Sequence, residues 1–445
     1  MTSSPSPALA ARLAALTPQQ RALLRAKVLG ARPQERLTPG QRRLWETHHA
    51  IGGRPADVVC QAVRLTGATA DLDRLAERVE GFVRDHEALR TTFEETGGEV
   101  RPVVHEALPP RLTRSHCATA QEAEALAREL AREPFDLASG PLLRVVLATG
   151  PAAQEAWLLV VVHNLVFDAW SFEMLLDALD RDAGAPAPAV TPFSRWAREQ
   201  AAWVAGDAGR AAAEYWAGVV DAPPPPLPTD RPRSGTTARN GNRVAFSLPP
   251  GVTAGIAALA KREAASAYAG WLAVAWAALE KFGGHADVLL GTFTAGRDRP
   301  GAETAVGYLL NVLPVRLRNP DDGSWAARVR TARTISRAGL RHAAYPGELI
   351  DAPRRVPGTH PLFDAVFVFD NLGETTRTLQ DAVVSTTDVD KGTARYDLTL
   401  AVYPRADGVT GWLEYDTELY EEATVRRLAE LFTAAAEEAS REGCR

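Results

Sequence analysis

The chain has 445 residues, of which 46% are apolar and 24% are charged, the profile of a soluble globular protein. This length exceeds what one hydrophobic core usually serves, so two domains or two large lobes are expected. The net charge of −5 gives no electrostatic reason to expect a nucleic-acid partner. No stretch approaches about 18 uninterrupted apolar residues, so no membrane span is expected.

Cysteine usage indicates the compartment. The three cysteines, Cys60, Cys117 and Cys444, are too few for a disulfide framework and lack the spacing of metal ligands. We therefore expect no metal site and a reducing, cytoplasmic location. The first residues show no positive cluster followed by an apolar run, so no signal peptide is expected.

The first elements are predicted by local signals. A helical extension is expected over residues 1–34, where Thr17-Pro18-Gln19-Gln20 is a typical helix start. Apolar spacing over 71–89 predicts an amphipathic helix. The segment 91–104 after it predicts two strands around Gly97-Gly98.

The apolar run 156–162 lacks alternation and predicts a strand that is buried on both faces. A helix is expected after it, with four apolar side chains on its inner face: Phe172, Leu175, Leu176 and Leu179.

Residues 222–243 give the clearest boundary, because four consecutive prolines precede a tract of loop-forming residues. After this linker we expect a strand, one helix over 252–282, a buried strand, and a last helix near 422–441. Each half mixes strands and helices, so the fold class is mixed α/β. The predicted division is an extension (1–34), a first lobe (35–221), the linker (222–243) and a second lobe (244–445).

A polar cluster follows the buried strand in the sequence "VVHNLVFDAWS", residues 161–171. Functional side chains often lie at such strand ends. His163 with Asp168 could act as a base and its orienting partner. A hydrogen-bonded histidine at a strand end is the alternative, and spacing alone favours it.

Several segments, in order, resemble the condensation domains of nonribosomal peptide synthetases, within the chloramphenicol acetyltransferase-like superfamily. They are "LTPGQRRLW" (37–45), "RDHEALRTTF" (84–93), "PFDLASGPLLRVVL" (134–147), "LPTDRPR" (227–233), "GTFTAGRDRPGAETAVGYLLNVLPVRLR" (291–318), "HAAYP" (342–346), "HPLFDAVFVFDN" (360–371) and "YDLTLAV" (396–402). The resemblance implies two acyltransferase-like lobes in a V around a central tunnel. Two carrier proteins would approach from opposite ends, each with a substrate on a phosphopantetheine arm.

The family's active-site motif is His-His-x-x-x-Asp-Gly, and here it departs at two positions. His163 matches the first His, Asn164 the second, Asp168 the Asp and Ala169 the Gly. The resemblance assigns catalysis to the second position. Asn164 has no titratable group near neutral pH and cannot be a general base, although its amide could bind a nucleophile or an oxyanion.

The resemblance also suggests roles for the other motif residues. Ala169 would add a methyl where space is tight. His163 is expected to be structural, because adjacent residues at a strand end point to opposite faces. Asp168 is expected to pair with Arg297 and shape the site, with an ordinary surface charge as the alternative for Arg297.

Three further residues are candidates for lining the tunnel: Trp170, Ser171 and Asn311. For two of them an alternative stays open: Trp170 as a core residue and Ser171 as a helix cap. Arg84 and Arg90 are expected to hold their own segment or to line the donor end of the tunnel. His342 is expected to be structural.

Three functions follow from the resemblance. The first is condensation, by amide or ester formation, between carrier-bound substrates with an altered site. The second is a non-catalytic module that binds carriers or recruits a tailoring enzyme. The third, acyl transfer from coenzyme A, is less favoured by the motifs. No permanently bound cofactor is expected, other synthetase domains are further candidate partners, and a monomer is expected.

Overall fold

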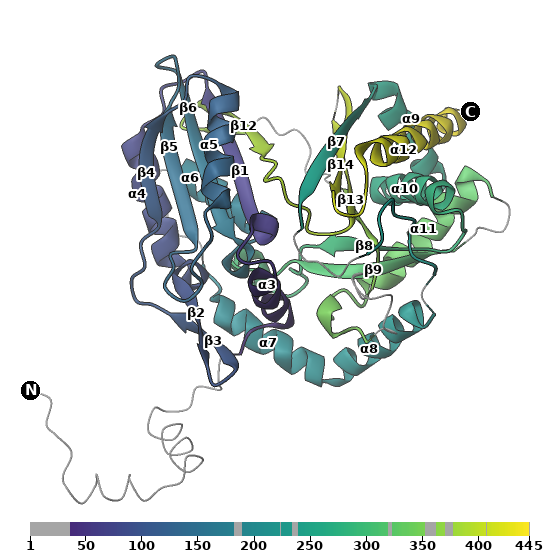
Figure 1. The fold of residues 1–445 in the computed structure, drawn as a ribbon, viewed down its shortest axis with the longest axis horizontal. Helices are drawn as coiled ribbons and strands as arrows, with labels where there is room; N and C mark the ends of the chain where they lie inside the picture. The colour runs from purple at the N-terminus through teal and green to yellow at the C-terminus, as the bar shows by residue number, and fades with distance from the viewer. Residues whose placement is uncertain are drawn as a thin grey trace, which may run out of the picture.

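The computed structural model describes residues 36–181, 189–222, 224–233, 239–318, 323–351, 362–369, 377–405 and 407–444. The extension predicted over 1–34 lies outside these residues, as do parts of the predicted linker. The described chain forms two lobes that stand side by side and diverge toward the top of Figure 1. Each lobe is built on a six-stranded sheet, so the expected mixed α/β fold with two lobes is confirmed.

The first lobe has the strand order β11-β12-β1-β6-β5-β4. Its central strand, β6, is buried almost throughout because it is apolar on both faces. Helix α5 packs on β1 and β6, and α4 packs against α6. The bounds are β1 Val58–Thr66, α4 Leu72–Asp85, β4 Arg111–His116, α5 Ala120–Arg132, β5 Leu143–Thr149, β6 Glu155–His163, α6 Ala169–Asp180, β11 Thr378–Leu379 and β12 Ala382–Asp388.

The second lobe has the strand order β7-β14-β13-β10-β8-β9. Helix α10 is apolar nearly all round and packs against α9, α11 and α12. The bounds are β7 Gly241–Leu248, α9 Pro250–Arg262, α10 Ala267–Gly283, β8 Val288–Thr294, β9 Asn311–Leu317, α11 Trp325–Leu340, β10 Ala365–Phe369, β13 Leu398–Arg405, β14 Gly408–Asp416 and α12 Glu422–Gly443.

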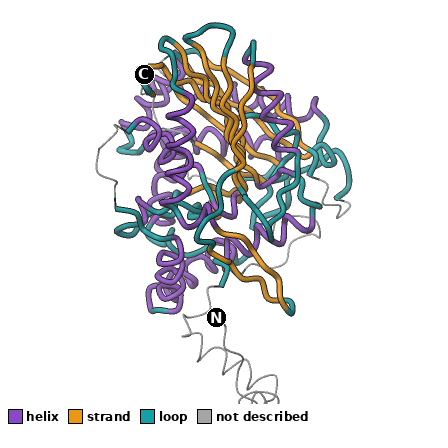
Figure 2. The backbone as a smooth tube through the Cα atoms, turned by 90° about the vertical axis from the view of Figure 1, so that its left-hand side faces the viewer, coloured by secondary structure: helices purple, strands orange, loops and turns teal. Residues whose placement is uncertain are grey.

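Three helices and a hairpin lie at the base of the two lobes (Figure 1). The helices are α3 Pro39–Ala50, α7 Phe193–Ala205 and α8 Asp207–Val220. The predicted hairpin consists of β2 Thr91–Thr96 and β3 Glu99–Val104, and it projects away from both sheets (Figure 2). The remaining short 3₁₀ turns are η1 Pro55–Asp57, η2 Glu87–Arg90, η3 Asn164–Val166, η4 Ala302–Thr304 and η5 Gly347–Leu349.

The chain does not divide between the lobes in the way the sequence predicted. Strands β11 and β12, from the predicted second lobe, complete the sheet of the first lobe, where β12 pairs with β1. Helix α8, from the predicted first lobe, packs on β9 of the second. The linker also packs onto the second lobe, because the Leu227 amide donates to Asp364 at 3.0 Å.

The single helix predicted over 252–282 is also wrong, because the chain breaks it into α9 and α10. Ala264 has a φ of +49°, outside the helical region, and Ser266 caps the new helix by accepting from the Ala269 amide at 3.3 Å. The sequence is rich in alanine on both sides of the break, and alanine favours helix, so the sequence predicted one continuous helix. Within the described ranges, no helix combines the length and the apolar character needed to cross a membrane.

Candidate active site

The polar cluster lies where β6 ends and α6 begins. β6 ends at His163, η3 covers Asn164–Val166, and Asp168 caps α6. The turn is fixed from outside by Gln41, whose Nε2 donates to the Leu165 carbonyl at 2.9 Å. Gln41 is itself held in a capping box with Thr38 at the start of α3. The segment 37–45 therefore supports the turn at the end of β6.

His163 is buried and its ring is locked in place. Its Nδ1 accepts from the Leu165 amide at 3.1 Å, so the ring proton is on Nε2, which faces His48 Nδ1 at 3.2 Å. Burial, with smaller contributions from His48 and Arg395, holds the pKa of His163 well below its ordinary value. With its only lone pair already bonded, His163 cannot act as a base toward a substrate.

Asn164 points away from this interior. Its side chain is only partly buried, in contrast to that of His163. Its Nδ2 makes one long contact of 3.4 Å to the Phe167 carbonyl, and its Oδ1 accepts from no described residue. The amide therefore keeps an acceptor, and most of its donor capacity, for a bound molecule.

Asp168 and Arg297 form a buried ion pair between the two halves of the chain. Arg297 Nη1 and Nη2 donate to the two carboxylate oxygens of Asp168 at 2.8 and 2.9 Å, and both side chains are at most 3% exposed. Asp168 also accepts from the Ser171 amide and hydroxyl and from the Leu309 amide. The alternative of Arg297 as a surface charge is wrong, and a carboxylate with five donors is a structural anchor rather than a base.

Ser171 and Asn311, two of the candidates for lining the tunnel, are instead buried and hydrogen-bonded to the protein. Ser171 is fully buried, and its hydroxyl accepts from the Gly307 amide at 3.1 Å, so it lines no tunnel; Asp168, not Ser171, is the helix cap. Asn311 is also buried: its Nδ2 donates to the carbonyls of Ala343 and Tyr345, and its Oδ1 accepts from Gly347. Both residues hold backbone segments together.

Trp170 and Ala169 also differ from expectation. Trp170 is 40% exposed, so it is not a core residue; its Nε1 donates to the Glu303 carbonyl at 3.2 Å. Ala169 is exposed at the first position of α6, and its φ is not positive. The methyl group therefore meets no crowding within the described protein, and the backbone there does not require glycine.

Of the two arginines in the segment 84–93, Arg90 holds its own segment, through backbone carbonyls rather than ion pairs. Arg90 Nη1 donates to the carbonyls of His105 and Glu106, which ties its segment to the chain after the hairpin. Arg84 is exposed on α4. His342 stacks on Tyr215 with ring centroids 4.2 Å apart, and it is a packing residue.

A second polar cluster behind the site was not predicted. Arg395 Nε lies 2.9 Å from Asp57 Oδ1, and its Nη2 donates to the Tyr308 hydroxyl at 2.9 Å. Burial raises the pKa of Tyr308. These three residues come from segments more than 80 residues apart, so no local pattern signals them, although Tyr308 lies within the quoted segment 291–318.

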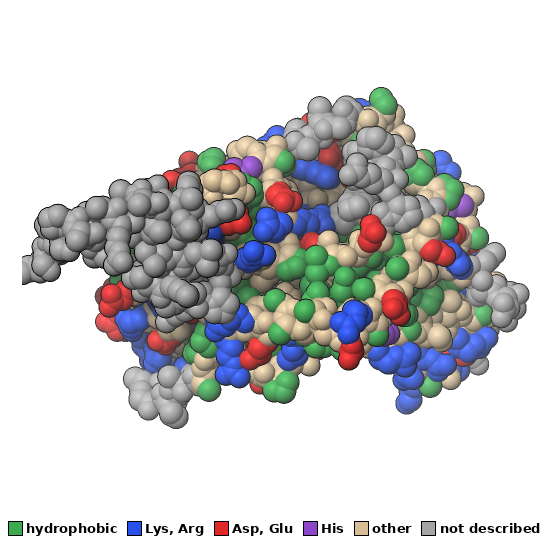
Figure 3. Space-filling view, turned by 90° about the horizontal axis from the view of Figure 1, so that it is seen from below, with side chains coloured by type: hydrophobic (Ala, Val, Ile, Leu, Met, Phe, Trp, Pro, Cys, Tyr) green, Lys and Arg blue, Asp and Glu red, His purple; other side chains and the backbone are tan. Residues whose placement is uncertain are grey.

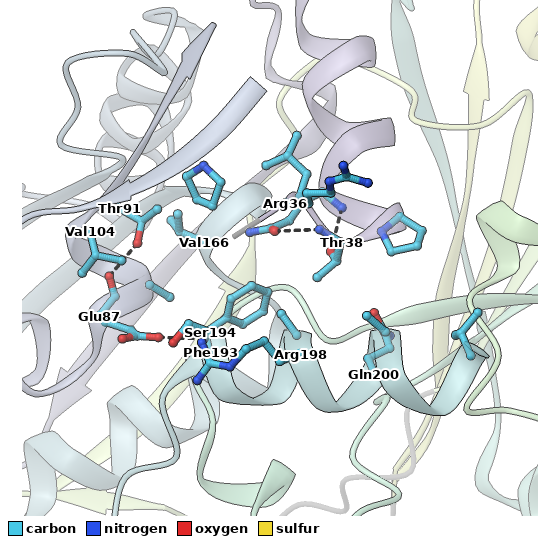
Figure 4. A pocket seen from close by; sticks show the side chains of 18 of the residues that line it. Arg36, Thr38, Glu87, Thr91, Val104, Val166, Phe193, Ser194, Arg198 and Gln200 are labelled. Atoms are coloured by element: carbon cyan, nitrogen blue, oxygen red, sulfur yellow. Dashed lines mark hydrogen bonds between the residues drawn. The ribbon is translucent and has the colours of Figure 1, made fainter. Parts of the chain in front are cut away.

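A cavity of about 510 Å³ lies next to the turn. Figure 4 shows it between α7 and the start of α3, and Thr91 and Val104 of the β2–β3 hairpin also line it. Val166, two residues after Asn164, lies in its wall. The lining is mostly apolar, and the Glu87 carboxylate is already bonded to the Ser194 amide at 2.7 Å. Seen from the side of α7 and α8, apolar side chains gather in a hollow with charged side chains around it (Figure 3).

Together these contacts limit the chemistry of the site. His163 and Asp168 are fully bonded to the protein, so neither can take a proton from a substrate. Asn164 offers a neutral donor and acceptor at the end of a rigid strand. In the described ranges, no group of three histidine, cysteine or acidic side chains is arranged to bind a metal ion.

Comparison with known proteins gives the family. The family model described as "Condensation domain" matches residues 34–443, so the chain belongs to the condensation domain family. Its curated relatives include CymA of Salinispora arenicola, a probable non-canonical nonribosomal peptide synthetase that is 30% identical over 414 residues, 88% of this chain and 5% of that protein. Phosphinothricin tripeptide synthetase PhsC of Streptomyces viridochromogenes is 32% identical over 464 residues, which cover 95% of this chain and 42% of that protein. A linear gramicidin synthase of Brevibacillus parabrevis is 30% identical over 422 residues, 89% of this chain and 8% of that protein.

Solved structures agree on the fold. The condensation domain from the monacolin K polyketide synthase MokA has a TM-score of 0.82 at 20% identity, covering 91% of this chain and 97% of that one. The X-domain from teicoplanin biosynthesis has a TM-score of 0.80 at 22% identity, covering 93% and 96%. This chain spans less than half the length of the curated relatives described above.

Proposed function

We propose that this condensation domain joins two carrier-bound substrates by amide or ester formation, with Asn164 at the position of the catalytic histidine. The observation that carries the proposal is the free Oδ1 of Asn164, which lies at a rigid strand end two residues from a wall of the apolar cavity. Each substrate would arrive on the phosphopantetheine arm of its carrier, so the chain itself needs no resident cofactor.

Without a base, catalysis would rest on positioning. A positioned base contributes about 10²–10⁴-fold, or about 3–5 kcal/mol. Holding two tethered reactants together can contribute more, roughly 7–11 kcal/mol. Asn164 Oδ1 would accept a hydrogen bond from the attacking group, or Nδ2 would donate to the developing oxyanion. A neutral amine can attack before it loses its proton, so amide formation suits this site better than ester formation.

A second candidate function is a carrier-binding or recruiting module without catalysis. The observation in its favour is that the titratable motif residues, His163 and Asp168, are fully engaged in structural hydrogen bonds. One solved structure with this fold is a complex of the X-domain with OxyB from teicoplanin biosynthesis, and that complex supports a docking role for the fold.

Carrier affinity separates the two candidates. A condensation domain that uses the cavity should bind a phosphopantetheinylated carrier at least about tenfold more tightly than the unmodified carrier, because the arm adds buried contacts. Ala201→Trp, which fills the cavity from α7, should remove this preference. Ala202→Trp, on the same helix but outside the lining, should keep it. Equal affinity for both carrier forms would favour the recruiting module.

A further inference from the structure

A second cavity lies within the second lobe, at the edge strand β9, away from Asn164. Its volume is about 700 Å³, and its lining comes from α8, the start of α10, β8, β9 and α11. Sites for small molecules have volumes of roughly 300–1,000 Å³, so this cavity is large enough for a ligand.

The floor of this cavity is apolar and aromatic. Trp216, Tyr268, Phe293 and Phe369 lie in its wall. The polar atoms of the first two are already bonded: Trp216 Nε1 donates to the His342 carbonyl at 3.0 Å, and the Tyr268 hydroxyl donates to Thr292 at 2.9 Å. Trp216 is only 1% exposed and supports the wall from behind, whereas Tyr268, Phe293 and Phe369 are partly exposed and offer apolar surface to a ligand.

The rim of the cavity is basic. Four arginines line it, and no aspartate or glutamate is present among the described lining residues. Two of them, Arg316 and Arg318, share the carboxylate of Asp287. The other two, Arg333 and Arg337, make no ion pair with any residue that the structure describes; Arg333 Nη1 donates only to the Glu263 carbonyl, at 2.7 Å. Their positive charge is not neutralised within the described protein.

Helix α11 carries both of these arginines and has no acidic residue over Trp325–Leu340. Its other two arginines do not line the cavity and are neutralised by Glu280 and Glu263. Arg333 and Arg337 are four residues apart and therefore share a face of the helix. Leu340, at the end of the helix, lines the cavity and is 64% exposed. An exposed leucine beside unpaired arginines is suited to a ligand that is apolar at one end and anionic at the other.

We propose that this second cavity binds an amphipathic anion, with an acyl or aryl body against the aromatic floor and a phosphate or carboxylate at Arg333 and Arg337. Such a molecule can be a free amphiphile or an acylated phosphopantetheine arm on a carrier protein. The proposal goes beyond the proposed function, because it does not depend on the chemistry at Asn164.

Calorimetric titration of the full chain with octyl phosphate tests this site. Octyl phosphate should bind at least about tenfold more tightly than octyl glucoside or octyltrimethylammonium, which share its chain but lack its charge. Arg337→Glu should weaken octyl phosphate binding at least about tenfold, whereas Arg427→Glu, the same charge change on exposed α12, should alter it less than about twofold. Equal binding of the three probes, equal binding by the two variants, or no binding would overturn the proposal.

A competition experiment then identifies the source of the ligand. Displacement of octyl phosphate by an acylated holo-carrier, but not by the unmodified carrier, would assign the site to a tethered arm. Binding without displacement would assign it to free amphiphiles. Ala201→Trp fills the first cavity and should leave octyl phosphate binding unchanged, so failure of the proposed function and failure of this site give different results.

Discussion

Replacement of Arg297 by methionine should destabilise the protein more than any surface ion-pair mutation. The substitution leaves the Asp168 carboxylate, which is only 1% exposed, without its cationic partner. Breaking a buried pair costs about 3–5 kcal/mol. Asp168 keeps three donors, from the Ser171 amide and hydroxyl and the Leu309 amide, so we expect the lower end, about 3 kcal/mol.

Urea denaturation followed by far-ultraviolet circular dichroism measures this loss. Arg64→Met is the matched control, because the Arg64–Glu155 pair has the same length, 2.8 Å, but Arg64 is 45% exposed. The control should lose at most about 1 kcal/mol. Because Asp168 and Arg297 come from different halves of the chain, the Arg297→Met variant should also unfold less cooperatively.

A double-mutant cycle isolates the pair itself. Asp168→Asn alone and Arg297→Met alone each leave one buried charge, whereas the double variant leaves none. The double variant should therefore be more stable than the sum of the two single losses by about 2 kcal/mol. A loss of less than about 1 kcal/mol for Arg297→Met, or additive single losses, would refute the reasoning that this pair anchors the site.

Three further predictions follow from the site and its surroundings. Asn164→Ala should slow single-turnover condensation by about 5–150-fold, equivalent to about 1–3 kcal/mol, because the amide binds the nucleophile or the oxyanion. An unchanged rate would show that the Asn164 side chain takes no part in catalysis. Asn164→His should raise the rate, more for a hydroxyl than for an amine acceptor, and Ala169→Gly should not be needed for this gain, because Ala169 is exposed and unstrained. Burial lowers the pKa of His86 to about 4, against an ordinary value of 6.5. The unfolded state therefore binds more protons between these values, so the free energy of unfolding should fall by about 1.4 kcal/mol per pH unit as pH drops through this window, and His86→Gln should flatten the profile.

Local sequence patterns predicted the elements whose shape is decided by near neighbours. The buried strand before Asn164, the helix after it and the β2–β3 hairpin lie where apolar spacing and the Gly97-Gly98 turn indicated. The membership of β12 in the first sheet could not be predicted in this way. Most of its side chains are exposed or only partly buried, and its partner β1 lies more than 300 residues earlier in the chain.

The same distinction applies to the site. The burial of His163 and the partial exposure of Asn164 agree with the prediction from strand alternation, although β6 ends at His163 and Asn164 begins a 3₁₀ turn. The choice of Arg297 as the partner of Asp168 came from the family motif, because 129 residues separate the two. The burial of Ser171 and Asn311 and the exposure of Trp170 depend on which backbone segments pack nearby, which a single sequence does not specify.

Product formation in a single turnover tests the central claim most directly. The unmodified protein would be mixed with its native donor and acceptor carriers, loading of both would be verified, and the carrier-bound species would be followed by mass spectrometry. We predict that the joined product appears on the acceptor carrier faster than in the absence of the protein, and that Asn164→Ala slows it. The absence of product from both the unmodified protein and the Asn164→His variant would contradict the catalytic function.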